Sequence, residues 1–172
     1  MSFYTLTSYN GNGSQVQNFN QYNTTANFKN SFREPIVIEP YSYIRLNFFS
    51  AYLTSDANKR SFFVLCPTFT SMSSQMGEIG KCGVLGIQRL PDGVGSTEPG
   101  TKNSYVNNSD YPYVAINNAE RLYVSEIEIK VVWEDGSICD NLDGYNYSTG
   151  HSQEEATSVG IHIIPSTFNK II

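Results

Sequence analysis

The stretch Arg121–Gly136, with the sequence RLYVSEIEIKVVWEDG, decides the fold class of this chain. From residue 127 to residue 133 every second position is apolar, and Glu126, Glu128 and Lys130 hold neighbouring positions. Alternation with a period of two is typical of a β-strand with one buried and one solvated face. Asp-Gly pairs supply the positive φ angles of a type I′ turn, so the stretch predicts a long strand followed by a hairpin turn.

A second region of alternation covers residues 36–53. Apolar side chains take even positions up to Phe48 and odd positions from Phe49 onward, which predicts a β-bulge at this pair. Pro40 cannot donate a ladder hydrogen bond, so we expect one strand to end there and a turn to lead into the next. Ser61–Cys66 is nearly all apolar and predicts a strand that is buried on both faces.

The rest of the chain favours the same class. Leu122 and Val124 lie in the opposite register to the apolar residues after them, which predicts a bulge at Ser125. Further strands are expected over residues 82–90, 113–116, 137–142 and 158–164, with long polar loops at 68–80, 91–112 and 143–157. No segment has a helical stripe with a period of 3.6. We predict an all-β, eight-stranded antiparallel sandwich, and the long excursions favour a single jelly roll.

The N-terminal segment has a different composition. Its first charged residue is Lys29, and Asn, Gln, Ser, Thr and Gly dominate before it. Aromatic residues stand singly in this neutral segment, where each suits a pocket on another subunit: Phe3, Tyr4, Tyr9, Phe19, Tyr22 and Phe28. We predict an extended docking arm over residues 1–31, a sandwich over 32–168 and a short tail over 169–172. The alternative is an edge strand and loop folded back on the same domain.

Composition excludes several classes of partner. The 172-residue chain has a net charge of −5 and no basic stripe, which argues against nucleic-acid binding. No apolar run is long enough to span a membrane, and the segment after Met1 lacks the features of a signal peptide. We therefore expect synthesis in the cytoplasm without secretion. Charged residues make up 16% and aromatic residues 13%, which suits a surface partly covered by neighbours.

No set of residues points to catalysis. His162 is expected on a strand surface and His151 in a solvated loop, and neither has the convergent partners that a metal site needs. Three widely spaced cysteines fit free thiols, and Cys66 fits a small buried hydrophobic residue. We predict a protein that is not an enzyme and needs no cofactor and no metal.

Tyrosines in the two long loops are the other candidates for binding: Tyr105, Tyr111, Tyr145 and Tyr147. Tyrosine offers a large contact area and a hydroxyl group at little cost in rotamer entropy. Such loops can contact a neighbouring subunit, stack on a sugar ring, or cap the ends of the sandwich itself. Together with the N-terminal aromatic residues they form the predicted subunit interface.

Two segments carry a resemblance to a known group of proteins. Pro35–Ala51, PIVIEPYSYIRLNFFSA, resembles the opening strands of small jelly-roll virion proteins, and Arg121–Leu142 is similar to a hairpin late in such proteins. The group comprises the single-jelly-roll penton and minor capsid proteins of virophages, polinton-like viruses and related icosahedral double-stranded DNA viruses. The resemblance covers residues 33–165 as a pattern of strands and includes no diagnostic motif.

The resemblance implies a structural role in the virion capsid. Such proteins assemble as homopentamers at the fivefold vertex, or lie against the shell in contact with the major capsid protein; a trimer also fits this chain. Phe3, Tyr4, Phe19 and Tyr22 would then be arm anchors. The alternative function is a receptor- or carbohydrate-binding sandwich, such as a spike or fibre head. An enzyme of cupin or glycosidase type fits least.

Overall fold

The computed structural model describes residues 2–8, 26–52, 61–69, 83–89, 102–106, 113–139 and 157–166. All its regular elements are β-strands, in this order: β1 (Ser2–Thr7), β2 (Asn27–Ile38), β3 (Tyr43–Tyr52), β4 (Ser61–Cys66), β5 (Gly83–Arg89), β6 (Lys102–Val106), β7 (Val114–Ala115), β8 (Leu122–Trp133) and β9 (Ser158–Ile164).

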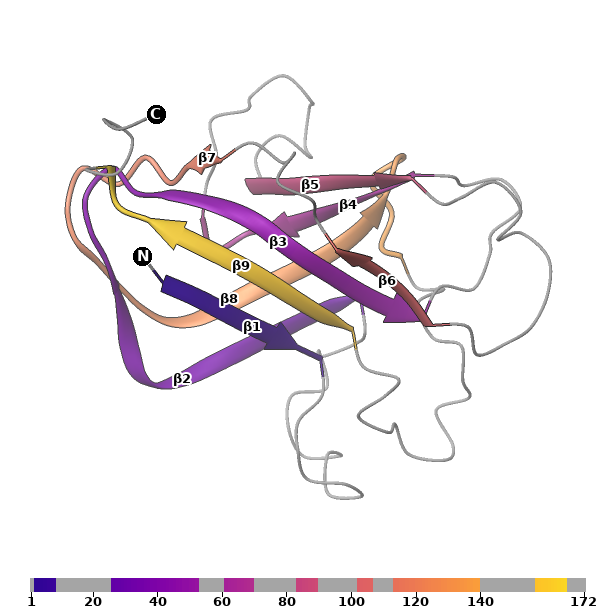
Figure 1. The fold of residues 1–172 in the computed structure, drawn as a ribbon, viewed down its shortest axis with the longest axis horizontal. Coiled ribbons are helices and arrows are strands. Elements are labelled where there is room, and N and C mark those ends of the chain that lie inside the picture. The colour runs from indigo at the N-terminus through magenta and orange to yellow at the C-terminus, as the bar shows by residue number, and fades with distance from the viewer. Residues whose placement is uncertain are drawn as a thin grey trace.

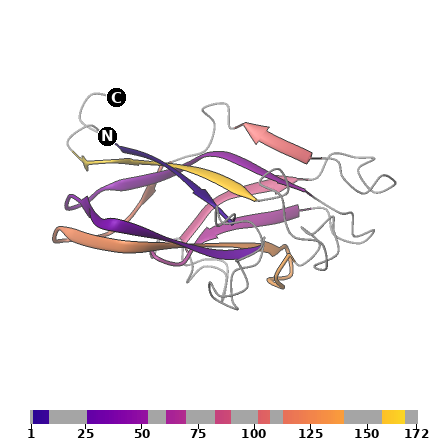
Figure 2. The same ribbon diagram turned by 90° about the horizontal axis from the view of Figure 1, so that it is seen from below.

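These strands form two antiparallel sheets that pack face to face. One sheet has the order β1-β9-β3-β6, with the short β7 paired to β3, and the other has the order β2-β8-β4-β5. Figure 1 looks onto the first sheet, and Figure 2 shows the two sheets as separate layers. The prediction of an all-β antiparallel sandwich is confirmed.

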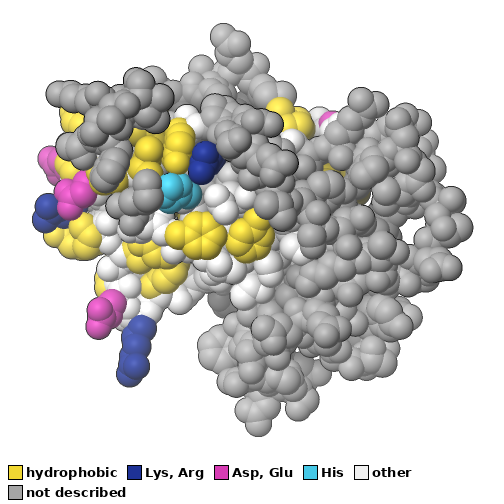
Figure 3. All heavy atoms as spheres, in the orientation of Figure 1, with side chains coloured by type: hydrophobic (Ala, Val, Ile, Leu, Met, Phe, Trp, Pro, Cys, Tyr) yellow, Lys and Arg dark blue, Asp and Glu magenta, His cyan; other side chains and the backbone are white. Residues whose placement is uncertain are grey.

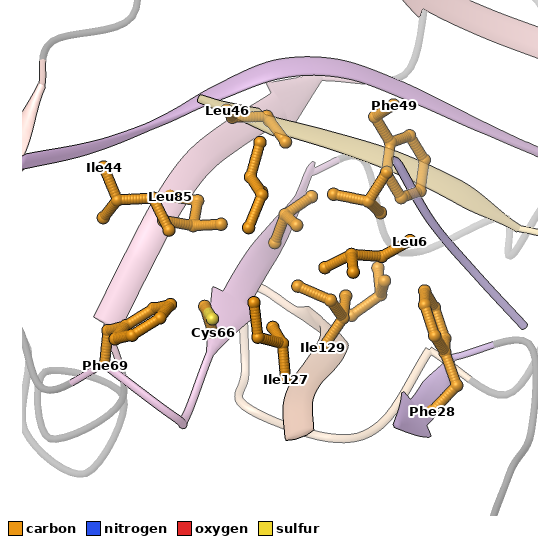
Figure 4. Packing of buried hydrophobic residues seen from close by; sticks show 14 of the residues in the cluster. Leu6, Phe28, Ile44, Leu46, Phe49, Cys66, Phe69, Leu85, Ile127 and Ile129 are labelled. Carbon is orange, nitrogen blue, oxygen red and sulfur yellow. The ribbon is translucent and has the colours of Figure 1, made fainter. Parts of the chain in front are cut away.

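One hydrophobic core fills the space between the sheets. In β8, Ile127, Ile129 and Val131 are fully buried, while Glu128 and Lys130 between them reach solvent. Side chains from both sheets point toward one another in Figure 4, including Leu46 and Phe49 from β3. Each fully buried residue of this kind contributes about 1.5–3 kcal/mol of hydrophobic stabilisation. The period-two pattern thus places this core directly.

Strand β4 is buried on both faces, as its sequence predicts. Phe62 and Val64 belong to the core between the sheets. Phe63 and Leu65 point the other way and form a second cluster with Val132 of β8. A strand with apolar neighbours on both faces needs no polar alternation.

The β2–β3 connection also agrees with the sequence. Strand β2 ends at Ile38, and Tyr41 adopts a positive φ of 56° in the turn that follows Pro40. A register shift lies between Leu46 and Phe48, so the predicted bulge is present but begins one residue earlier. As a result Phe48, expected on the core face, lies on the other face of the sheet.

Asn118 fixes this end of the sandwich from the connection between β7 and β8. Its side chain is 6% exposed and donates to the carbonyl oxygens of Glu39 (2.7 Å) and Glu120 (3.0 Å). Its Oδ1 accepts a hydrogen bond from the Ser42 amide at 3.2 Å. One buried amide therefore satisfies backbone groups of two separate connections.

Two details around β8 differ from the prediction. Gly136 has a φ of 84°, but Asp135 does not have a positive φ, so the hairpin turn is not type I′. Its pattern is that of a three-residue loop closed by a left-handed glycine. The register break lies opposite Ser125 as expected, but the extra residues are in β2, between Ser31 and Ile36.

The prediction of a separate N-terminal arm is wrong for the described residues. Ser2–Thr7 is strand β1, which pairs along its length with β9. Asn27–Ser31 is the first part of β2 and pairs with β8, so the boundary at residue 31 falls inside a strand. Period-two burial of Tyr4 and Leu6 holds β1 in place despite its neutral composition. Residues 9–25 lie outside the described part of the chain.

Two other expectations need correction. The predicted loop over 91–112 contains strand β6, which pairs with the end of β3. The predicted return strand over 137–142 is reduced, within the residues described, to one bridge between Val132 and Ile138. Among the described residues no helix is long and apolar enough to cross a membrane.

Candidate functional site

The outer face of the β1-β9-β3 sheet gathers aromatic and basic side chains. Phe3 of β1 and Arg45 of β3 both pair with His162 of β9, so the three residues form one row across the sheet. His162 lies between the buried Ile161 and Ile163, and alternation directs its side chain away from the core. Figure 3 views this face, where hydrophobic side chains lie beside a histidine and a basic side chain. We call it the aromatic face.

A glycine provides the seat for one of its rings. Gly160 of β9 pairs with Phe48 of β3, and the Phe48 ring occupies the space that a side chain at residue 160 would need. The centroids of the Phe48 and Phe3 rings are 6.3 Å apart at an interplanar angle of 34°. Phe3 remains 52% exposed. The exposed Phe3 ring and the half-buried Phe48 ring therefore form one apolar patch on this face.

Tyr113 closes the other side of the aromatic face. It lies just before β7, which pairs with the start of β3. Its hydroxyl oxygen is 3.0 Å from Nδ1 of His162, and the Arg45 guanidinium carbon is 4.6 Å from the centre of its ring. The second distance is that of a cation–π contact. Tyr113 thus holds the histidine and the arginine in one arrangement.

Electrostatics keep His162 neutral near pH 7. Partial burial, followed by the positive charge of Arg45, lowers the pKa of His162 below its usual value of 6.5. A neutral imidazole can accept a hydrogen bond from the Tyr113 hydroxyl at Nδ1. A protonated imidazole carries hydrogens on both nitrogens and can only donate. The lowered pKa favours the neutral form, in which Nδ1 can accept a hydrogen bond from Tyr113.

The aromatic face offers several groups that can contact a partner. It offers two rings, a neutral imidazole and a stacked guanidinium, which are groups that bind apolar, aromatic or planar partners. Within the described ranges no group of three or more His, Cys, Asp or Glu side chains could hold a metal ion. Such a face suits a second protein surface or a sugar ring.

The outer face of the other sheet differs where β2 and β8 form it. Lys29 Nζ lies 3.2 Å from Glu126 and 4.0 Å from Glu128, and Lys130 Nζ lies 3.1 Å from Glu128. These groups are 22–40% exposed, and exposed ion pairs of this kind add little to stability. Their main effect is to keep this part of the surface solvated. The two outer faces are therefore chemically unequal.

The predicted interface residues differ in where they lie in the structure. Phe3 is exposed on the aromatic face, whereas Tyr4 is half-buried and packs edge-on against Phe32, with centroids 5.9 Å apart. Phe28 is fully buried in the core of its own subunit, so its assignment as an intersubunit anchor is wrong. Tyr105 lies in β6, where its backbone pairs with Phe49. The others lie outside the described residues: Tyr9, Phe19, Tyr22, Tyr111, Tyr145 and Tyr147.

Sequence reasoning placed His162 correctly but missed its neighbours. Arg45 and Phe48 were expected only as strand residues, and Tyr113 was expected as a loop tyrosine at the start of a short strand, without a contact to His162. The Gly-Ile-His-Ile pattern in β9 carried one usable signal, because a glycine in a strand often marks the close approach of another group. Cys66 is fully buried, and burial raises the pKa of its thiol to about 12. This agrees with its prediction as a buried hydrophobic residue.

Comparison with protein-family models, curated proteins and solved structures found no match for this chain.

Proposed function

We propose that the sandwich is a single jelly roll. Its pairings β4·β5, β3·β6, β2·β8 and β1·β9 are those of one long hairpin whose two arms pair along their length. Wrapping that hairpin brings β9 beside β3 and β8 beside β4, which are the remaining long pairings. Eight strands arranged in this way make a jelly roll, a fold used by capsid and lectin domains.

We infer that the protein is a structural virion subunit, a penton or minor capsid protein, that assembles with itself and with the major capsid protein. The observation that carries this proposal is the aromatic face, where the exposed ring of Phe3 lies beside the half-buried ring of Phe48 on the outside of the β1-β9-β3 sheet. Burial of exposed aromatic area is the main driving force of subunit association. No catalytic step, cofactor or metal is part of the proposal.

A closed ring is the assembly that we propose, with five copies as the first choice and three as the second. One apolar face per subunit suits a repeated contact with a different surface of the next copy. In this arrangement Phe3 remains an anchor and Phe48 joins it. The charged part of the other sheet would face solvent.

Native mass spectrometry and negative-stain electron microscopy of the full-length protein test the ring. Closed rings of one size are expected, and Phe48→Glu should disrupt them because it places a charge in the contact. Tyr123→Glu is the matched control, since Tyr123 is 69% exposed on β8 and lies outside the aromatic face. A wild-type protein that remains monomeric at high concentration, or rings that tolerate Phe48→Glu, would contradict the proposal.

Two further measurements separate this function from carbohydrate binding. The chain should be found by mass spectrometry in purified particles of a virus that encodes it. A glycan array should show no binding above background. Glycan binding that is abolished by Phe48→Ala would favour the receptor-binding alternative instead.

A further inference from the structure

Strand β1 has an open edge. It pairs with β9 on one side, and no described strand pairs with its other side, which is the margin of the sheet in Figure 1. The open edge of a β-strand carries unpaired N–H and C=O groups that can template another strand. We propose that β1 of one copy pairs antiparallel with β1 of a second copy, which joins the two sheets into one. This inference does not rest on the proposed virion function.

The hydrogen-bond pattern shows which residues face the open edge. The Ser8 amide donates to the Thr157 carbonyl oxygen at 2.9 Å, so even-numbered residues of β1 direct their backbone groups toward β9. Odd-numbered residues direct theirs the opposite way. Thr7 confirms this, because its amide donates to Asn30 Oδ1 at 2.9 Å and its carbonyl accepts from Asn30 Nδ2 at 2.7 Å. The side chain of Asn30 therefore caps the edge at Thr7 and leaves Phe3 and Thr5 open.

Strand β2, an edge strand of the other sheet, is protected against pairing with another chain. Exposed charges stand on β2 at Lys29, Arg33 and Glu34, and Pro35 follows them at an irregularity in the register. Charged side chains, proline and bulges are the devices by which proteins stop edges from pairing. Ser2–Thr7 contains none of them. Of these two edges, the chain protects β2 and leaves β1 available.

The occupant that fits this edge is a second β1. The strand carries no charged residue, so two copies meet without like-charge repulsion. The Asn30 cap also limits the register. Pairing Thr5 with Thr5 would need Thr7, which is already bonded, whereas pairing Phe3 of each copy with Thr5 of the other uses only open residues.

This register is self-complementary. It places Tyr4 directly opposite Tyr4 of the second copy, on the twofold axis, and forms two reciprocal backbone pairs between Phe3 and Thr5. The two Phe3 rings become diagonal neighbours on the same face, at about 7–8 Å, within reach of aromatic side chains. A twofold contact of this type would link copies from two different rings, since a closed ring uses a different contact.

Sedimentation equilibrium of the full-length protein tests the pairing. Thr5→Pro removes an outward N–H but no hydrogen bond to β9, and proline is tolerated at such edge positions. Thr5→Lys adds a protective charge without changing the backbone. We expect each variant to raise the dissociation constant of the twofold contact by about tenfold or more. Val37→Lys is the matched control, because it adds the same charge at an exposed site on β2 and should change nothing.

Engineered cysteines test the register. Directly opposite residues of a non-hydrogen-bonded pair have Cα atoms about 4.5 Å apart, within the range for a disulfide. Tyr4→Cys should therefore form a covalent dimer under mild oxidation, while Ser2→Cys, offset along the strand, should not. Circular dichroism and thermal melting show whether each variant is folded.

The outcomes are distinguishable from those of the ring. Thr5→Pro should separate rings from one another and leave each ring intact, whereas Phe48→Glu should do the reverse. Association that is unaffected by both Thr5 variants, or cross-linking at Ser2→Cys but not at Tyr4→Cys, would overturn the proposal. So would a wild-type chain that shows no twofold contact up to its solubility limit.

Discussion

At the residue scale, the aromatic face depends on a missing side chain. Gly160 lies in the middle of β9, between two strands, where a residue with a side chain would ordinarily strengthen the sheet. The Phe48 ring takes that space and is held against the sheet, and the bulge in β3 turns Phe48 to this side. The Phe48 ring therefore covers Gly160 and supplies the apolar surface that a side chain at residue 160 would otherwise provide.

Gly160→Ala should therefore destabilise the protein through Phe48. A methyl group at residue 160 would overlap the ring, and overpacking of this kind costs about 1–3 kcal/mol. Urea denaturation should show a lower midpoint with an unchanged slope. In a Phe48→Ala background the same substitution should cost much less, because the overlap has been removed. Equal costs in both backgrounds would show that the ring is not the cause.

His162 should give a pH dependence with a defined sign. Its folded pKa is lowered, so the unfolded chain binds a proton at higher pH than the folded protein does. The stability that neutral His162 contributes is present above pH 6.5 and falls as the pH drops from 6.5 toward the folded pKa. As the pH falls through that window, the unfolding free energy of the wild type should decrease relative to that of His162→Gln.

Nuclear magnetic resonance can follow the same group directly. The titration midpoint of His162 should lie below 6.5 and should rise in Arg45→Gln, because that substitution removes the nearby positive charge. Lys29→Gln changes a charge on the outer face of the other sheet and serves as the control. A titration midpoint that does not change in Arg45→Gln would show that Arg45 does not contribute to the lowered pKa of His162.

At the scale of elements, Asn30 joins the two sheets at one side of the sandwich, where β1 and β2 are the edge strands. Its amide forms two hydrogen bonds with the backbone of Thr7 and behaves like a short piece of an extra strand. This link fixes the end of β1 and satisfies backbone groups that would otherwise face the gap between the layers. A single polar side chain thereby stabilises a strand with few apolar anchors.

Asn30→Ala should loosen β1 selectively. Loss of two hydrogen bonds predicts a destabilisation of about 1–3 kcal/mol. Native-state hydrogen exchange should be faster at Thr7, while amides in the centre of β8 should follow only the global change. Asn30→Asp keeps the acceptor and loses the donor, so we expect an intermediate effect. Unchanged protection at Thr7 would contradict this role of Asn30.

The strands that the sequence predicted are those with a strong apolar period. β8, β9 and β4 each bury at least three apolar side chains in a short run, so the hydrophobic pattern alone identifies them. β6 was missed because its sequence is short and mostly polar, and β1 was expected only as the alternative to a docking arm because its neighbours in sequence are neutral and polar. Their pairing partners are far away in the chain, as Ser2 with Ile163 illustrates, and local sequence contains no record of such pairings.

At the scale of the whole molecule, only part of the candidate site was open to sequence reasoning. Alternation in β9 gives the direction of His162, but its hydrogen bond with Tyr113 spans 49 positions and depends on the register of three strands. The same holds for the row from Phe3 to Arg45. Sequence periodicity gives the face on which a residue lies, and topology decides its neighbours.

The pairing of β1 with β9 has a mechanical consequence. Ser2 and Ile163 are opposite one another, so the first and last strands present their outer ends at the same corner of the sheet. A force that pulls these ends apart would break the hydrogen bonds between β1 and β9 one after another and would not load them all at once. Tension that enters through the chain ends would therefore open the domain at low force.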